Sequence, residues 1–183
     1  MQPFFQNMAQ LLSAIEDCLE KRRLLPCLTL LYSGIDVVAS LERRSDEGTK
    51  AAFVRWVTEF LLKSYPLSCT ALELYAARCG VVHAFSPESD LSQRGVTRRL
   101  IYAWGNAKKS DLAEAAQRLN RTDVAVQVEE LIEGFRRGLV SYREEVVRDP
   151  ERRRRVEAGT DLWFVHMDQN SVKEFLHPHN REI

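Results

Sequence analysis

Apolar residues in the first 85 positions recur at the three- and four-residue spacing of an α-helix, and short breaks divide them into four segments. Pro26, the stretch 45–48 and Pro66 mark these breaks, because proline and glycine interrupt regular structure. Thr70 and Glu73 have the spacing of a capping box at the start of the fourth segment. Links this short place consecutive helices antiparallel. The pattern therefore predicts an up-and-down four-helix bundle, with helices over residues 3–23, 26–43, 49–65 and 68–85.

The second half of the chain is less regular. Two short aromatic segments, residues 99–104 and 162–166, are candidate strands that could pair as a two-stranded ribbon, and 99–104 fits a helical turn as well. Helices are predicted over four further stretches: residues 111–119, residues 124–148 with Asp123 as the cap, the charged segment after Pro150 and a short segment after Ser171. We therefore predict a mainly α protein, in which residues 1–105 form the bundle and residues 106–183 form a helical extension packed on it.

Composition narrows the function classes. The chain has 26 basic and 26 acidic residues and a net charge of zero, so any contact with nucleic acid has to be local. Four cysteines lie in apolar stretches without CxxC spacing, which favours reduced core thiols over a disulfide or metal framework: Cys18, Cys27, Cys69 and Cys79. His166, His177 and His179 have no neighbouring cysteine or spaced carboxylate pair, so we expect no metal and no cofactor.

The start of the chain has no basic region followed by an apolar run, as a signal peptide would have. We also expect no apolar segment of the about 18 residues that a membrane span needs. These features predict no contact with a membrane and a cytoplasmic location.

The strongest candidate for chemistry lies in the fourth helical segment. Arg78 is followed by four residues and then by His83, within an otherwise apolar stretch. A buried guanidinium is costly to desolvate without an anionic partner, and histidine is the side chain that changes charge most easily near neutral pH. Together the two residues could bind a phosphate and move a proton. Since this spacing arises about once by chance in a chain of this composition, its apolar context is what singles it out.

The second helical segment offers an anionic partner. Asp36 lies on a polar stripe opposite the apolar stripe, and Tyr32 lies one turn before it. One interpretation places Asp36 beside Arg78, where the carboxylate orients the guanidinium. The alternative is a stripe that faces water, while Arg78 pairs with an acidic residue for structural reasons only.

A second basic feature is the run Arg152, Arg153, Arg154 and Arg155, which Glu151 and Glu157 flank. A solvated helix face is the default interpretation of such a run. Contact with the phosphate backbone of RNA is the alternative.

These residues resemble the HEPN family (higher eukaryotes and prokaryotes nucleotide-binding). The family's helical bundle carries Arg, four to six residues and then His on its last core helix. The matching segments in this chain are Leu74-Tyr75-Ala76-Ala77-Arg78-Cys79-Gly80-Val81-Val82-His83 and Tyr32-x-x-Ile35-Asp36. The resemblance covers roughly residues 5–105.

The resemblance implies a metal-independent endoribonuclease of the toxin–antitoxin or phage-defence type. His83 would then act as general acid or base and Arg78 would stabilise the phosphate, while Asp36, Tyr32, Cys79 and Gly80 take supporting positions. It also implies a homodimer that joins two Arg–His pairs in one cleft, with RNA as the substrate and an antitoxin protein as a candidate partner. Active members commonly place Asn or Asp directly after the Arg, where this chain has Cys79.

Two other functions fit the same residues. One is a non-catalytic HEPN-like module that binds nucleotide, RNA or a protein partner. The other is a structural helical protein in which Arg78 serves only to pair with Asp36.

Overall fold

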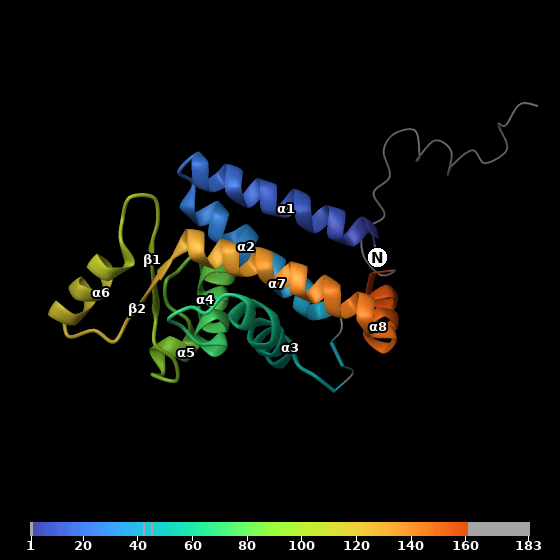
Figure 1. The fold of residues 1–183 in the computed structure, drawn as a ribbon. Helices are drawn as coiled ribbons and strands as arrows, with labels where there is room; N and C mark the ends of the chain where they lie inside the picture. The colour runs from blue at the N-terminus through green and yellow to red at the C-terminus, as the bar shows by residue number, and fades with distance from the viewer. Residues whose placement is uncertain (1, 42, 45, 161–183) are drawn as a thin grey trace, which may run out of the picture.

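The computed structural model describes residues 2–41, 43–44 and 46–160. These residues form a mainly α fold with a small two-stranded parallel sheet, which confirms the predicted fold class (Figure 1). The first half contains α1 (Gln2–Glu20), α2 (Leu24–Leu41), α3 (Thr49–Trp56), the π-helical segment η1 (Val57–Leu62), α4 (Ala71–Ala84) and α5 (Asp90–Gln93). The second half contains β1 (Leu100–Ala103), α6 (Lys109–Arg118), β2 (Val124–Gln127), α7 (Val128–Arg148) and α8 (Pro150–Thr160).

The four helical segments predicted for the first half are present, with shifted ends. Helix α2 begins at Leu24, two residues before Pro26, which is tolerated because the first N–H groups of a helix have no intrahelical acceptor. Helix α4 has the predicted capping box. The Thr70 hydroxyl accepts from the Glu73 N–H, and the Glu73 carboxylate accepts from the Thr70 N–H at 2.8 Å. This reciprocal cap fixes the start of the helix that carries Arg78 and His83.

The third helical segment changes its winding at Val57, where α3 continues as η1. Helix α7 crosses this segment at close range. A Cβ on Gly138 would lie 3.1 Å from the Leu61 Cα, and one on Gly134 would lie 3.2 Å from a Leu61 methyl group. The glycines therefore let the two backbones approach each other. Apolar periodicity predicts the helix here but does not separate a π-helical turn from an α-helical one.

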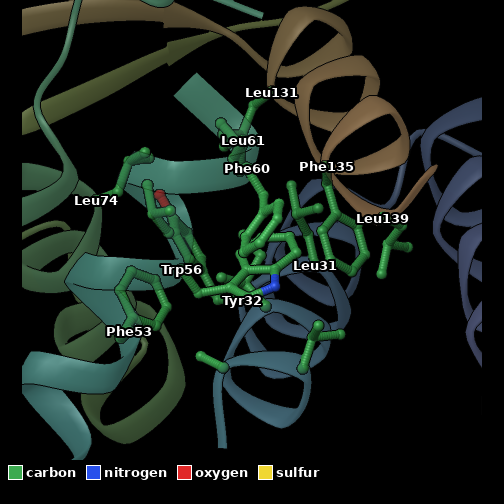
Figure 2. Packing of buried hydrophobic residues seen from close by; sticks show 14 of the residues in the cluster. Leu31, Tyr32, Phe53, Trp56, Phe60, Leu61, Leu74, Leu131, Phe135 and Leu139 are labelled. Carbon is green, nitrogen blue, oxygen red and sulfur yellow. The ribbon is translucent and has the colours of Figure 1, made fainter. Parts of the chain in front are cut away.

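One hydrophobic core joins both halves of the chain (Figure 2). Tyr32 and Trp56 from the first half are fully buried, as are Phe135 and Tyr142 from α7. The Trp56 ring centroid lies 6.0 Å from that of Phe135 and 6.1 Å from that of Tyr142. Helix α7 thus supplies part of the core. The domain division at residue 105 and the up-and-down order of the bundle stay predictions.

The parallel sheet corrects the predicted start of one helix. Strand β1 pairs with β2, with Leu100 opposite Val124 and Ala103 opposite Gln127. The prediction of a helix from Val124 onward, with Asp123 as its cap, is therefore wrong for its first turn. Val124 and Val126 have β-branched side chains that suit a buried strand, and α6 supplies the crossover that a parallel pair requires. The predicted partner strand, residues 162–166, and the helix predicted after Ser171 lie outside the described residues.

Helix α2 corrects the estimate of apolar segment length. Its 18 residues have a mean hydropathy of 1.7, so by length and composition it could cross a membrane. Half of this window is buried inside the structure, and core helices of soluble proteins meet the same criteria. Membrane contact and cellular location stay predictions.

Candidate functional site

Helices α2 and α4 bring three of the predicted residues together. Arg78 donates from Nη2 to the Asp36 carboxylate and from Nη1 to Nε2 of His83, at 2.7 Å. The side chains of Arg78 and Asp36 are 12% and 19% exposed, so little water screens their charges. His83 lies at the exposed end of α4. The cluster thus runs from a half-buried carboxylate, through a guanidinium, to an imidazole at the surface.

Hydrogen-bond chemistry fixes the direction of the Arg78–His83 contact. A guanidinium has only donors, so Nε2 of His83 must be the acceptor. In this arrangement the imidazole is neutral and carries its proton on Nδ1. The Cys79 thiol lies 3.9 Å from the same Nη1 atom, as a weak acceptor. Among the described residues, the hydrogen-bond partners of Nη1 are therefore an imidazole and a thiol.

The ion pair does not use every polar atom it buries. Asp36 Oδ1 and Arg78 Nε are buried and have no hydrogen-bond partner within the described part of the chain. Burial alone would lower the pKa of the Arg78 guanidinium, but the hydrogen bond and charge of Asp36 raise it above its ordinary value. Arg78 therefore keeps its positive charge despite its burial.

The cluster opens into a surface pocket of about 700 Å³. Arg78, Cys79 and His83 of α4 line one side, and Lys50 and Arg94 add two more cationic side chains. The residues that follow α4, including Ser86, Glu88 and α5, line the other side. The pocket thus offers three cationic side chains and an imidazole, beside the carboxylates of Glu88 and Asp90, to a ligand of small-molecule or nucleotide size.

Gly80 lets the opposite wall approach helix α4. A Cβ at this position would lie 2.6 Å from the Ser86 carbonyl oxygen and 2.8 Å from that of Glu88. The Ser86 N–H in turn donates to the Gly80 carbonyl at 3.1 Å. Gly80 was predicted only as a supporting residue, and the structure gives it this packing position.

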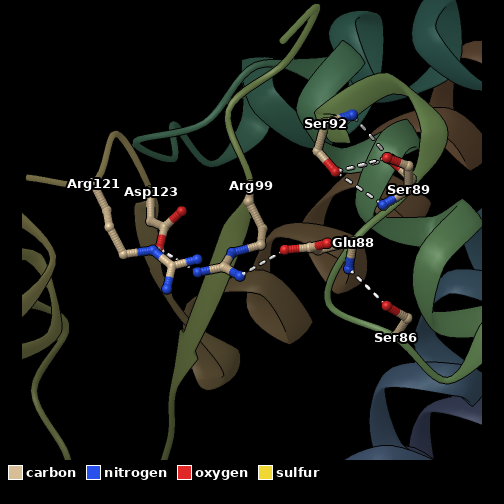
Figure 3. Close-up of polar contacts among 7 residues, drawn as sticks. All are labelled: Ser86, Glu88, Ser89, Ser92, Arg99, Arg121 and Asp123. Carbon is tan, nitrogen blue, oxygen red and sulfur yellow. Dashed lines mark hydrogen bonds and ion pairs between the residues drawn. The ribbon is translucent and has the colours of Figure 1, made fainter. Parts of the chain in front are cut away.

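Glu88 ties the wall to the parallel sheet (Figure 3). Arg99, at the start of β1, donates to the Glu88 carboxylate at 3.2 Å and to the Asp123 carboxylate at 2.5 Å. Arg121 lies 3.0 Å from the same Asp123 carboxylate. Asp123 therefore serves as an anchor for two arginines, at a point where it was expected to cap a helix.

A second pocket of about 640 Å³ lies on the far side of Glu88. Its arginines are Arg98, Arg99 and Arg121, and each contacts a carboxylate. Arg98 holds Glu73 through two hydrogen bonds, at 2.5 and 3.1 Å. Burial alone would raise the pKa of Glu73, but the bonds from Arg98 and from the Thr70 N–H lower it. The charges of this second cluster are matched within the protein.

Tyr32, predicted as a supporting residue, lies in the hydrophobic core. It is fully buried, and its hydroxyl lies 2.7 Å from the hydroxyl of Tyr102 on β1. The tyrosine that lines the pocket is Tyr75, which belongs to the predicted segment 74–83 but was not predicted as a site residue. Burial and the neighbouring Cys79 thiol raise the pKa of Tyr75. Its helical spacing of three residues from Arg78 and four from Cys79 was a usable signal.

The arginine run on α8 is divided between two environments. Arg152 packs its guanidinium over the Phe60 ring, 5.2 Å from the centroid, and Arg153 donates to the Val147 carbonyl at 2.8 Å. Arg154 and Arg155 are exposed. Arg152 also lies 3.4 Å from the Glu59 carboxylate, so its charge is matched, whereas Arg153 keeps its charge beside an uncharged acceptor. A role of the run in RNA binding stays a prediction.

Within residues 2–41, 43–44 and 46–160, no group of three or more His, Cys, Asp or Glu side chains could hold a metal ion. His166, His177 and His179 lie outside these residues. The four cysteines are free thiols; Cys27 and Cys69 are buried, while Cys18 and Cys79 are half-buried.

No family model, no curated protein and no solved structure matches this chain.

Proposed function

We propose that this protein is a HEPN-like, metal-independent endoribonuclease, of the toxin–antitoxin or phage-defence type and cytoplasmic. The observation that supports the proposal is the position of Arg78. Its guanidinium is oriented by Asp36, lies beside Nε2 of His83, and lines an open pocket with two further cations. A guanidinium next to an imidazole supplies the two groups that RNA transesterification needs.

The proposed reaction begins when an RNA phosphate enters the pocket and takes the Nη1 hydrogen bond from His83. This exchange replaces an uncharged acceptor with an anion, which strengthens the bond to Arg78. It also frees the Nε2 lone pair of His83, which removes the proton of the adjacent 2′-hydroxyl. The 2′-oxygen attacks phosphorus, the bond to the 5′-oxygen breaks, and the products are a 2′,3′-cyclic phosphate and a 5′-hydroxyl end. Arg78 stabilises the charge that grows on the phosphate oxygens.

The 5′-oxygen leaves more easily if a second acid protonates it. One cluster supplies a single imidazole, so we propose that two copies form a two-fold homodimer and that His83 of the second copy, released from Arg78 and protonated to imidazolium, provides this proton and returns to neutral imidazole. A chain that elutes as a monomer at micromolar concentration during gel filtration would contradict the dimer. An antitoxin protein that covers the same cleft is a candidate partner.

Incubating the purified protein with single-stranded RNA and EDTA tests this function. We expect cleavage with cyclic-phosphate ends, and no cleavage where the nucleotide before the scissile phosphate is 2′-deoxy. His83→Ala should lower the rate by about 10²–10⁴-fold, the range for loss of a general acid or base. Arg78→Lys keeps a charge for Asp36 but loses the forked donor, and should also be inactive. Arg118→Lys, on the exposed face of α6, is the matched control. Failure to cut RNA with and without metal would exclude the enzyme.

A non-catalytic module that binds nucleotide, RNA or a protein partner is the second candidate. It is favoured by the contact between Arg78 and His83, because Arg78 occupies the Nε2 atom that a general base would need. This function predicts RNA or nucleotide binding without turnover, and binding that tolerates His83→Ala.

A further inference from the structure

The residue that ends helix α4 has an unusual conformation for its type. Phe85 has φ 48° and ψ 35°, in the left-handed region, and its N–H donates to the Gly80 carbonyl. This position after a helix usually carries glycine, since a Cβ is unfavourable there. A bulky phenylalanine in this conformation costs stability that glycine or asparagine would not.

Burial in the hydrophobic core does not offset this cost for Phe85. Phe85 is 68% exposed, and it is absent both from the buried core cluster and from the partly buried side chains that pack against it. Exposing the ring to water is a second unfavourable feature. Two other described residues outside glycine have a positive φ, Arg22 and Asn120, and both are polar. Phe85 therefore combines backbone strain with an exposed aromatic side chain.

The location of Phe85 gives these two features a common explanation. Its neighbours in the chain, Ala84 and Ser86, both line the pocket that contains Arg78 and His83. Phe85 thus lies at the rim of that pocket, two residues beyond the imidazole. The left-handed turn is what directs the chain from α4 into the opposite wall at this rim.

We infer that Phe85 is a stacking platform for a nucleobase of single-stranded RNA, while the adjoining phosphate occupies the pocket. This inference rests on the proposed function. Lys50, Arg78 and Arg94 are the cations that would hold a phosphate, in a lining that also includes Glu88 and Asp90, and in RNA every phosphate has a base within one nucleotide of it. Aromatic side chains bind unstacked bases through their faces, largely irrespective of sequence. Phe85 would then fix how the strand enters the site, without taking part in the chemistry.

The test compares Phe85→Gly with the wild type in two measurements. Binding is measured with a short RNA that is 2′-O-methylated to prevent cleavage and carries 2-aminopurine, whose fluorescence reports stacking. Stability is measured by denaturant unfolding. We expect Phe85→Gly to unfold at higher denaturant concentration and yet to bind the RNA about 5- to 100-fold more weakly, the loss that one stacked base implies. Phe85→Trp should keep the affinity, and Phe85→Asn should behave like the glycine variant. Leu119→Ala removes a side chain of matched exposure, 69%, and should change neither measurement.

The outcomes separate this inference from the function on which it rests. Wild-type protein that binds the RNA, with Phe85→Gly of equal affinity, overturns the stacking platform alone. Wild-type protein that neither binds nor cuts RNA overturns both proposals. If Phe85→Gly converts a dimer to a monomer and loses RNA affinity only for that reason, the ring contacts a second copy and the stacking platform is wrong.

Discussion

Two arginine clusters lie on either side of the segment that connects α4 to β1, and they differ in what their guanidinium groups contact. Arg98, Arg99 and Arg121 each contact a carboxylate, from Glu73, Glu88 or Asp123. Arg78 contacts one carboxylate through Nη2, whereas the partners of its Nη1 among the described residues are the imidazole of His83 and the thiol of Cys79.

This difference indicates that Arg98, Arg99 and Arg121 stabilise the fold, whereas Arg78 can bind a ligand. An incoming anion gains little at Arg98, Arg99 and Arg121, because it would have to displace a carboxylate that already matches each charge. At Arg78 it displaces the imidazole acceptor from Nη1 and gains a charge-assisted bond. Burial or pairing of an arginine therefore says less about function than the charge of the partner that a ligand has to replace.

Removing the positive charge from each cluster should give the largest contrast. Arg78→Met leaves Asp36 half-buried, and among the described residues Arg78 is the only hydrogen-bond partner of that carboxylate. We expect a loss of about 3–5 kcal/mol in the free energy of unfolding. Arg98→Met should cost only about 1–3 kcal/mol, because Glu73 keeps the Thr70 N–H. Urea denaturation of both variants measures the difference.

A double variant controls for the loss of packing. Asp36→Leu combined with Arg78→Met removes both charges, and should recover most of the stability that Arg78→Met loses. Equal losses of unfolding free energy in Arg78→Met and Arg98→Met would show that the two arginines stabilise the fold to the same extent.

Local spacing in the sequence was enough to predict the cluster of Asp36, Arg78 and His83. The cluster of Arg98, Arg99 and Arg121 depends on long-range pairing, which the sequence does not show. Arg78 and His83 lie on one helix, and Asp36 lies on a helix that the apolar stripe already predicts. The partner of Arg99 is Asp123, 24 residues away, and the two meet only because β1 and β2 pair in parallel. Nothing in the run that begins at Val124 distinguishes a four-residue strand from the first turn of α7 until its partner is known.

The hydroxyl partner of Tyr32 was hidden for the same reason, since Tyr102 reaches it from the sheet. The wall after Ser86 contains polar residues that predict a loop, but its position depends on contacts with Gly80 and Arg99. Residues within one helix are thus predictable from the sequence, and the residues that close the pocket are not.

The second largest effect should come from closing the space between α4 and the pocket wall. Gly80→Ser places a side chain within 3 Å of two backbone carbonyl oxygens, and neither is the end of a flexible side chain. We expect a loss of about 1–3 kcal/mol in unfolding free energy, together with loss of ligand binding in the Arg78 pocket. Thermal and denaturant unfolding measure the first effect.

Gly48→Ser is the matched control, because a Cβ there meets no atom within 4 Å. Gly48 is also the N-cap of α3, where serine is a preferred residue, so this variant should be neutral or slightly stabilising. If the two serine variants behave alike, the wall does not depend on contact at Gly80.

Acid should also weaken the contribution of the Arg98–Glu73 pair to the free energy of unfolding, with a smaller effect than the variants above. The pKa of Glu73 is lowered from its ordinary value of 4.5 in the folded state, so its ionised form favours folding. This contribution is complete above the ordinary value and is lost as the pH falls through the lowered one. Glu73→Gln keeps a residue that a capping box accepts but removes the charge, and should cost about 1 kcal/mol at pH 7. The gap between variant and wild type should narrow below pH 4.5; a gap that stays constant from pH 7 to pH 3 would argue that the charge of Glu73 is irrelevant.

A cysteine lies near each arginine cluster: Cys69 near Glu73 and Cys79 beside Arg78. The smallest predicted effect on stability concerns Cys79. Cys69 is 5% exposed, and burial, together with the nearby Glu73 charge, raises the pKa of its thiol to about 12. Cys79 lines the Arg78 pocket and is half-buried. Cys79→Ser replaces a weak acceptor with a better one and should change the unfolding free energy by less than about 0.5 kcal/mol.

The rates at which Cys79 and Cys69 are chemically modified compare the two clusters independently of stability. The thiolate is the reactive form, so iodoacetamide at pH 8 should label Cys79 well before Cys69, as peptide mass spectrometry would show. Inorganic phosphate or a 2′-O-methylated RNA should slow the labelling of Cys79 if it occupies the pocket, and should leave the slow labelling of Cys69 unchanged. Protection of both thiols would mean that the anion acts on the whole fold, whereas protection of Cys79 alone places the anion beside Arg78. Only the latter result agrees with a cluster whose guanidinium is available to a ligand.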